Sequence, residues 1–125
     1  MRKALALILA LGLVACSAIA VPKTPAQTVY ALEGAYATAA RAELAYTGSA
    51  RADPGTVEAI RKADTVAYDA LVAAQKAVQS GQSAGGRAGA QFKESGGKAA
   101  EAAALSAAQD GISALVALLH SKGIV

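Results

Sequence analysis

Apolar residues recur every three or four positions in three segments of this chain of 125 residues. That spacing places them on one face of an α-helix. The segments are residues 25–46, 54–79 and 98–122. Their predicted inward faces are Val29, Leu32, Tyr36, Ala39, Ala40 and Leu44 in the first; Val57, Ile60, Ala67, Tyr68, Leu71, Ala74 and Val78 in the second; and Leu105, Ala108, Ile112, Leu115 and Leu119 in the third. No segment alternates apolar and polar residues as a half-buried strand does. We therefore predict an all-α fold without a β-sheet.

Local signals mark where the first two helices begin. Thr24 is followed by Pro25, and Asp53 is followed by Pro54. Threonine and aspartate are favoured N-cap residues, and proline is favoured at the first helical position. Because only a short turn separates the two helices, they should be antiparallel neighbours. Residues 26–79 are thus predicted to form a helical hairpin.

A change of composition separates this hairpin from the third helix. Residues 80–97 contain six glycines and three serines, the composition of a flexible linker. Gly81 is expected to end the second helix. The third helix, residues 98–122, is then predicted to pack on the hairpin and complete a small three-helix bundle.

The short turn also predicts which residues of the hairpin face each other. Pairing about it brings together residues whose numbers sum to about 104. The facing pairs are Tyr36 with Tyr68, Glu43 with Arg61, and Arg41 with Asp64. An unpaired charge beside an apolar face is costly, so we expect two interhelical ion pairs that fix the register. A carboxylate site for a ligand is the alternative interpretation of the same residues.

Composition limits the function classes. Cys16 is the single cysteine and His120 the single histidine, so neither a disulfide within the chain nor a metal site is expected. Basic residues form no stripe with interleaved aromatics, which argues against nucleic-acid binding. Because 35 residues are alanine, which forms helix well but buries little area, self-association, a partner or a membrane is expected to add stability.

The first residues have the pattern of an export signal. Arg2 and Lys3 precede an apolar run over residues 4–15, which is too short to span a bilayer and suits a signal peptide. The apolar block at residues 112–119 is only two helical turns long. We therefore expect a signal peptide at 1–15, a tether at 16–25, and no transmembrane helix.

The residues Leu13-Val14-Ala15-Cys16 resemble the lipobox of bacterial lipoproteins. This resemblance implies cleavage between Ala15 and Cys16, a diacylglyceryl thioether on Cys16, and acylation of its new amino group. Ser17, in place of aspartate, resembles the default for sorting to the outer membrane, with the domain on its periplasmic face. The alternative is an ordinary signal peptide cut after Ala20, which would release a soluble secreted protein.

The stretches "AQTVYALEGAYATAARAELAY" and "ADTVAYDALVAAQKAVQ", within residues 26–79, resemble small alanine-rich helical proteins of proteobacterial phages and prophages. That resemblance implies a context in which the host envelope is modulated, and it carries no catalytic residues.

One pattern has the form of a catalytic motif. Residues 81–85 fit G-x-S-x-G around Ser83, and Asp110 and His120 follow in the order of a hydrolase triad. The motif requires a strand before the serine, and a helix is predicted there instead. We therefore expect a non-enzymatic lipoprotein without cofactor, whose partner is an envelope component or a second copy of itself. A structural oligomeric envelope lipoprotein is the rival from another class.

Overall fold

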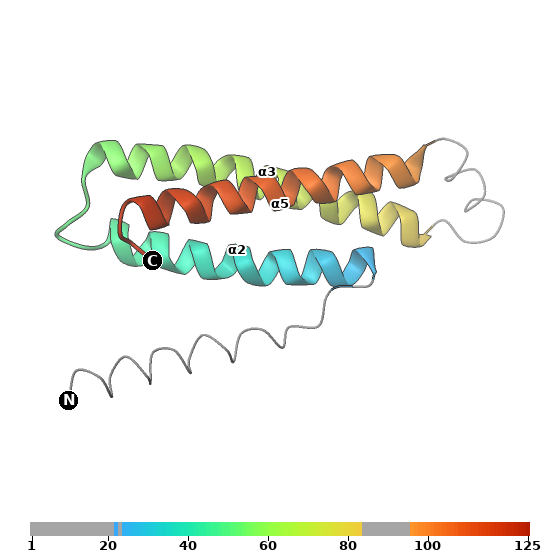
Figure 1. Cartoon of the computed structure of the whole chain (residues 1–125), viewed down its shortest axis with the longest axis horizontal. Helices are drawn as coiled ribbons and strands as arrows, with labels where there is room; N and C mark the ends of the chain where they lie inside the picture. Colours follow the sequence, from blue (N-terminus) through green and yellow to red (C-terminus); the bar gives the residue numbers. More distant parts are fainter. Residues whose placement is uncertain (1–21, 23, 84–95) are drawn as a thin grey trace, which may run out of the picture.

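The computed structural model describes residues 22, 24–83 and 96–125. Within these residues the chain forms three helices, α2 (Pro25–Thr47), α3 (Pro54–Ser83) and α5 (Gly97–Ser121), and no strand. They lie side by side along one long axis, with α3 antiparallel to both α2 and α5 (Figure 1). The predicted all-α three-helix bundle is confirmed.

The two predicted N-caps are present. The Thr24 hydroxyl accepts a hydrogen bond from the Gln27 amide at 3.2 Å. The Asp53 carboxylate accepts one from the Thr56 amide at 2.8 Å. Each bond satisfies an amide that has no partner within its helix, so the residue before each proline sets the start of the helix that follows.

Gly81 does not end the second helix, contrary to the sequence prediction. α3 continues to Ser83, so residues 80–83 of the predicted linker are helical, while residues 84–95 lie outside the described part. A single glycine in a helix costs only about 1 kcal/mol relative to alanine, which is too little to stop a helix whose preceding turns are packed. The third helix begins at Gly97, after Gly96 with a φ of 74°.

The core is a narrow seam along all three helices. Its buried apolar side chains are Val29 and Ala39 of α2; Ile60, Ala67, Leu71, Ala74 and Val78 of α3; and Ala108, Ile112, Leu115 and Leu119 of α5. All were predicted to face inward. Ile60, Leu115 and Leu119 are the largest fully buried ones.

The prediction was wrong for Leu44, whose side chain is 72% exposed. At 100° per residue, Leu44 lies about 110° from the middle of the buried stripe of α2. Tyr46 instead packs against the core at this end. Tyr68, also predicted to face inward, lies at the boundary and is 52% exposed.

Packing is unequal among the three helices. α3 and α5 contact each other far more extensively than either contacts α2. Gly111 of α5 permits this, because a Cβ at that position would lie 3.1 Å from the Cα of Ala67. α2 therefore lies against a closely packed pair.

Candidate functional site

The contact between α2 and α3 is built around Tyr36. Its ring faces that of Tyr68 with centroids 6.0 Å apart, as the hairpin register predicts. Its hydroxyl donates a hydrogen bond to the Asp64 carboxylate at 2.7 Å. Burial and this carboxylate raise the pKa of Tyr36 well above its ordinary value, so its hydroxyl remains a donor at neutral pH.

The two ion pairs predicted between α2 and α3 do not form direct contacts. Within the described residues, the ion pair with N and O within 4.0 Å is the exposed one between Lys62 and Glu58, at 3.4 Å. Asp64 bonds to Tyr36 instead of Arg41. The correction has a physical reason: a phenol hydroxyl loses less hydration than a guanidinium on entering a half-buried interface.

Glu43 is left without a direct cationic partner. Burial, and next the nearby Asp64, raise the pKa of Glu43, while Arg61 lowers it. Arg61 therefore acts on Glu43 through space rather than by contact. In the described part of the chain, no three Asp, Glu, His or Cys side chains gather as metal ligands would.

A second contact between these helices was missed by the sequence interpretation. The Gln75 side-chain amide donates to the Glu33 carboxylate at 2.6 Å. The residue numbers sum to 108, close to the predicted register, so the pairing rule could have found this contact. The residue types of Gln75 and Glu33 alone did not indicate that these two side chains would pair.

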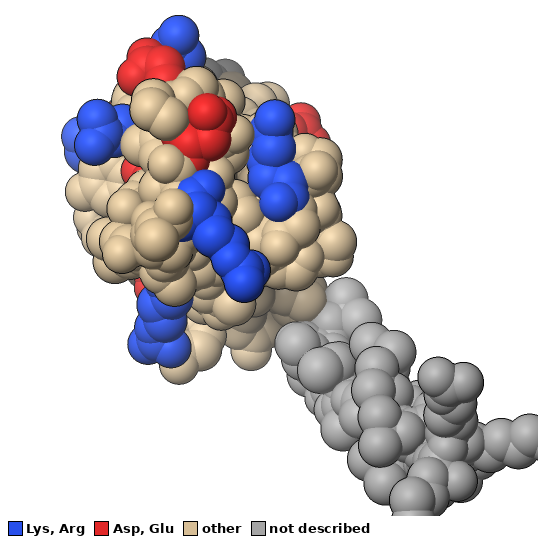
Figure 2. Space-filling model, turned by 90° about the vertical axis from the view of Figure 1, so that its left-hand side faces the viewer, with Lys and Arg blue, Asp and Glu red and all other residues tan. Residues whose placement is uncertain are grey.

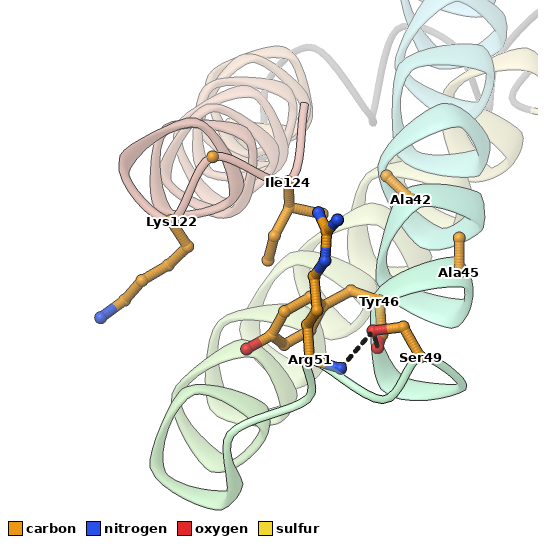
Figure 3. A pocket seen from close by; sticks show the side chains of 8 residues that line it. Ala42, Ala45, Tyr46, Ser49, Arg51, Lys122 and Ile124 are labelled. Carbon is orange, nitrogen blue, oxygen red and sulfur yellow. Dashed lines mark hydrogen bonds between the residues drawn. The ribbon is translucent and has the colours of Figure 1, made fainter.

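A depression lies at the turn end of the bundle. It is a groove of about 490 Å³ between the last turns of α2 and the segment that follows α5. Ala42, Ala45 and Tyr46 line one side, Ile124 and Lys122 the other, and Arg51 comes from the turn (Figure 3). The Arg51 guanidinium extends toward Ile124, whereas Lys122 lies on the rim and points away (Figure 3).

Hydrogen bonds hold both walls of this groove in place. The Ile124 amide donates to the Leu119 carbonyl at 2.9 Å and the Gly123 amide to the His120 carbonyl at 3.0 Å. On the other wall, the Tyr46 hydroxyl accepts from the Asp53 amide at 3.1 Å. Ile124 and Tyr46 are therefore fixed facing each other, although no sequence pattern singles them out.

Other predicted site residues lie apart or outside the described residues. Ala15, Cys16 and Ala20, on which both processing predictions depend, are outside them. Ser83 is the last residue of α3 and His120 is near the end of α5. Because these helices are antiparallel, Ser83 and His120 lie at opposite ends of the bundle (Figure 1) and cannot share a triad.

α5 is long and apolar enough to cross a membrane, by length and composition alone. Its mean hydropathy reaches 1.5, and 28% of its most apolar stretch is buried in the bundle. The apolar stretch is longer than residues 112–119, because alanine-rich turns before residue 112 extend it. This composition is compatible with membrane association, but the buried core helix of a soluble protein can have the same length and composition.

No protein-family model matches the sequence, no curated protein matches it, and no solved structure matches it. What the chain does therefore has to be inferred from its own residues.

Proposed function

We propose that this protein is a non-enzymatic bacterial lipoprotein whose helical bundle binds an envelope component or a second copy of itself. The observation that carries the proposal is the sequence Leu13-Val14-Ala15-Cys16, directly after the apolar run that follows Arg2 and Lys3. A thiol is the strong nucleophile that accepts the diacylglyceryl group. Two or more acyl chains hold a protein stably on a membrane, whereas one chain holds it only marginally.

The position of α2 is compatible with such an anchor. Eight residues separate Cys16 from Pro25, where α2 begins. A chain of that length spans at most about 29 Å. The start of α2 would thus be held near the lipid surface, and the turn end is the end of the bundle farthest from that attachment.

Localisation and physiological role belong to the same proposal. Ser17 favours the periplasmic face of the outer membrane. The alanine-rich hairpin favours a prophage-encoded role in modulating the host envelope, for example in superinfection exclusion or lysis. Acylation with palmitate or a similar chain is the modification implied.

The test is the intact mass of the mature protein from its native host. A mass that begins at Cys16 and includes acyl chains supports the proposal. A mass that begins at Val21 refutes it and favours a soluble secreted protein.

α5 offers a second route to the membrane, which needs its own control. The chain is placed behind an ordinary export signal so that it begins at Val21, and cells are fractionated. A lipid anchor at Cys16 predicts that this form becomes soluble. If it stays with the membrane, α5 is responsible.

Sedimentation of the mature protein distinguishes the proposed binding role from the rival structural role. A stable oligomer, above all a trimer, favours an envelope-spanning structural lipoprotein. A monomer favours a domain that binds another component.

A further inference from the structure

We propose that the groove at the turn end binds a short acidic peptide segment. The Arg51 guanidinium faces a carboxylate of this ligand, and Ile124 and Tyr46 contact an apolar side chain next to that carboxylate. This inference rests on the proposed function only for the position of the groove at the end of the bundle away from the anchor. The chemistry of the ligand is inferred from the residues of the groove.

Positive charge at the groove is not neutralised by direct contacts. Among the described residues, neither Arg51 nor Lys122 has a carboxylate within 4.0 Å. The nearby Asp53 carboxylate caps α3 through the Thr56 amide at 2.8 Å. Lys122 acts on that carboxylate through space and helps to lower the pKa of Asp53, after the hydrogen bonds from Thr56. Arg51 is therefore the cation that an incoming carboxylate meets, and its guanidinium can hold the carboxylate with two parallel hydrogen bonds.

Apolar side chains in fixed positions form two facing walls of the groove, beside the polar Ser49 and Arg51. Ala42 and Ala45 present only methyl groups, which leaves room above them, and the half-buried Tyr46 and Ile124 form facing walls (Figure 3). The volume of about 490 Å³ suits a few peptide residues rather than a folded domain surface. An apolar side chain beside an acidic one would fill it and place its carboxylate at Arg51.

A peptide fits this end of the bundle better than a lipid surface does. Basic and acidic side chains are mixed over the end that Figure 2 shows. A flat anionic membrane would meet both signs of charge, whereas a ligand inside the groove meets the Arg51 guanidinium, with Lys122 on the rim. Because α2 has 23 residues, the groove lies about 35 Å from the start of α2, which is the end of that helix nearest to the proposed anchor.

The test measures binding of a fluorescein-labelled hexapeptide, with two central glutamates flanked by leucines, to the purified full chain by fluorescence anisotropy. The matched ligand has glutamines in place of the glutamates. We expect the glutamine peptide, and the double variant Arg51→Gln/Lys122→Gln, each to bind at least about tenfold more weakly. The control Lys76→Gln/Lys98→Gln removes the same charge away from the groove and should change affinity less than about twofold.

Failure of the wild-type protein to bind the glutamate peptide would overturn the proposal. Equal weakening in both double variants would also overturn it, since net charge rather than the groove would then be responsible. The proposal would also be overturned if the protein used Arg51 and Lys122 to bind anionic phospholipid vesicles but did not bind the peptide. Circular dichroism checks that the variants remain helical. If the mature protein carries no lipid but binds the peptide, only the proposed lipid anchor is refuted. If it carries lipid but does not bind the peptide, only the proposed peptide-binding groove is refuted.

Discussion

Gly111 of α5 and Ala67 of α3 lie so close that a methyl group built on Gly111 would be 3.1 Å from the Cα of Ala67. Ordinary van der Waals contact begins at about 3.4 Å. The neighbour is backbone, which cannot rotate away, and Ala67 is fully buried. The absence of a side chain at Gly111 thus sets how closely α3 and α5 approach.

Gly111→Ala is expected to destabilise the bundle. Alanine gains about 1 kcal/mol of helix propensity over glycine. Overpacking of a close contact costs about 1–3 kcal/mol, so we expect a net loss of about 1 kcal/mol in the free energy of unfolding. Urea denaturation followed by circular dichroism measures it. An unchanged or higher stability would show that α3 and α5 separate without cost.

Gly34→Ala is the matched substitution and should have the opposite sign. Gly34 lies inside α2, and a Cβ there would meet nothing within 4 Å. Only the gain in helix propensity remains, so we expect about 1 kcal/mol of stabilisation. The same denaturation series measures it, and a loss of stability would mean that the outer face of α2 is covered by another surface.

Tyr36→Phe isolates the hydrogen bond between α2 and α3. It removes the 2.7 Å bond to Asp64 but keeps the ring contact with Tyr68. We expect a loss of about 1 kcal/mol in the free energy of unfolding. Tyr68→Phe is the control, because no hydrogen bond of the Tyr68 hydroxyl is described, and it should be nearly neutral. Equal effects of the two changes would assign the stabilisation to the rings rather than to the bond.

The fold was predictable where local chemistry decides it. Thr24 and Asp53, each before a proline, define helix starts without reference to the rest of the chain. The short turn then fixes the register, so that Tyr36 and Tyr68 face each other as expected. The end of α3 was missed because Gly81 is a weak signal, which packing of the preceding turns overrides.

The candidate sites were less predictable, because they depend on which partner each polar side chain contacts and on the conformation of the residues after α5. A facing pair of charges predicts proximity, but Asp64 bonds to a phenol and Glu43 to no cation. The groove exists because Gly123, with a φ of 66°, turns the chain and places Ile124 opposite Tyr46. A glycine directly after a helix is a signal for such a turn, but no spacing in the sequence indicates that the turn brings Ile124 opposite Tyr46.

Stability should depend on pH through Glu43. Burial, followed by Asp64, raises its pKa above the ordinary value of 4.5. The folded protein then holds this proton more tightly than the unfolded chain. The resulting stabilisation is fully present below the ordinary pKa and is lost as the pH rises through the raised one. Above the raised pKa the carboxylate is ionised and half-buried without a contacting cation, so Glu43→Gln should there be more stable than the wild type.

The advantage of Glu43→Gln should shrink as the pH falls toward about 4, because the wild-type carboxyl then becomes neutral as well. Urea denaturation of both proteins at several pH values on either side of the raised pKa measures the difference. Glu58→Gln is the control, since Glu58 is exposed and paired only with Lys62, and it should show no gain at neutral pH. A Glu43→Gln difference that stays constant over the whole range would mean that Glu43 titrates alike in the folded and unfolded protein. Its burial between α2 and α3 would then have no effect on its charge.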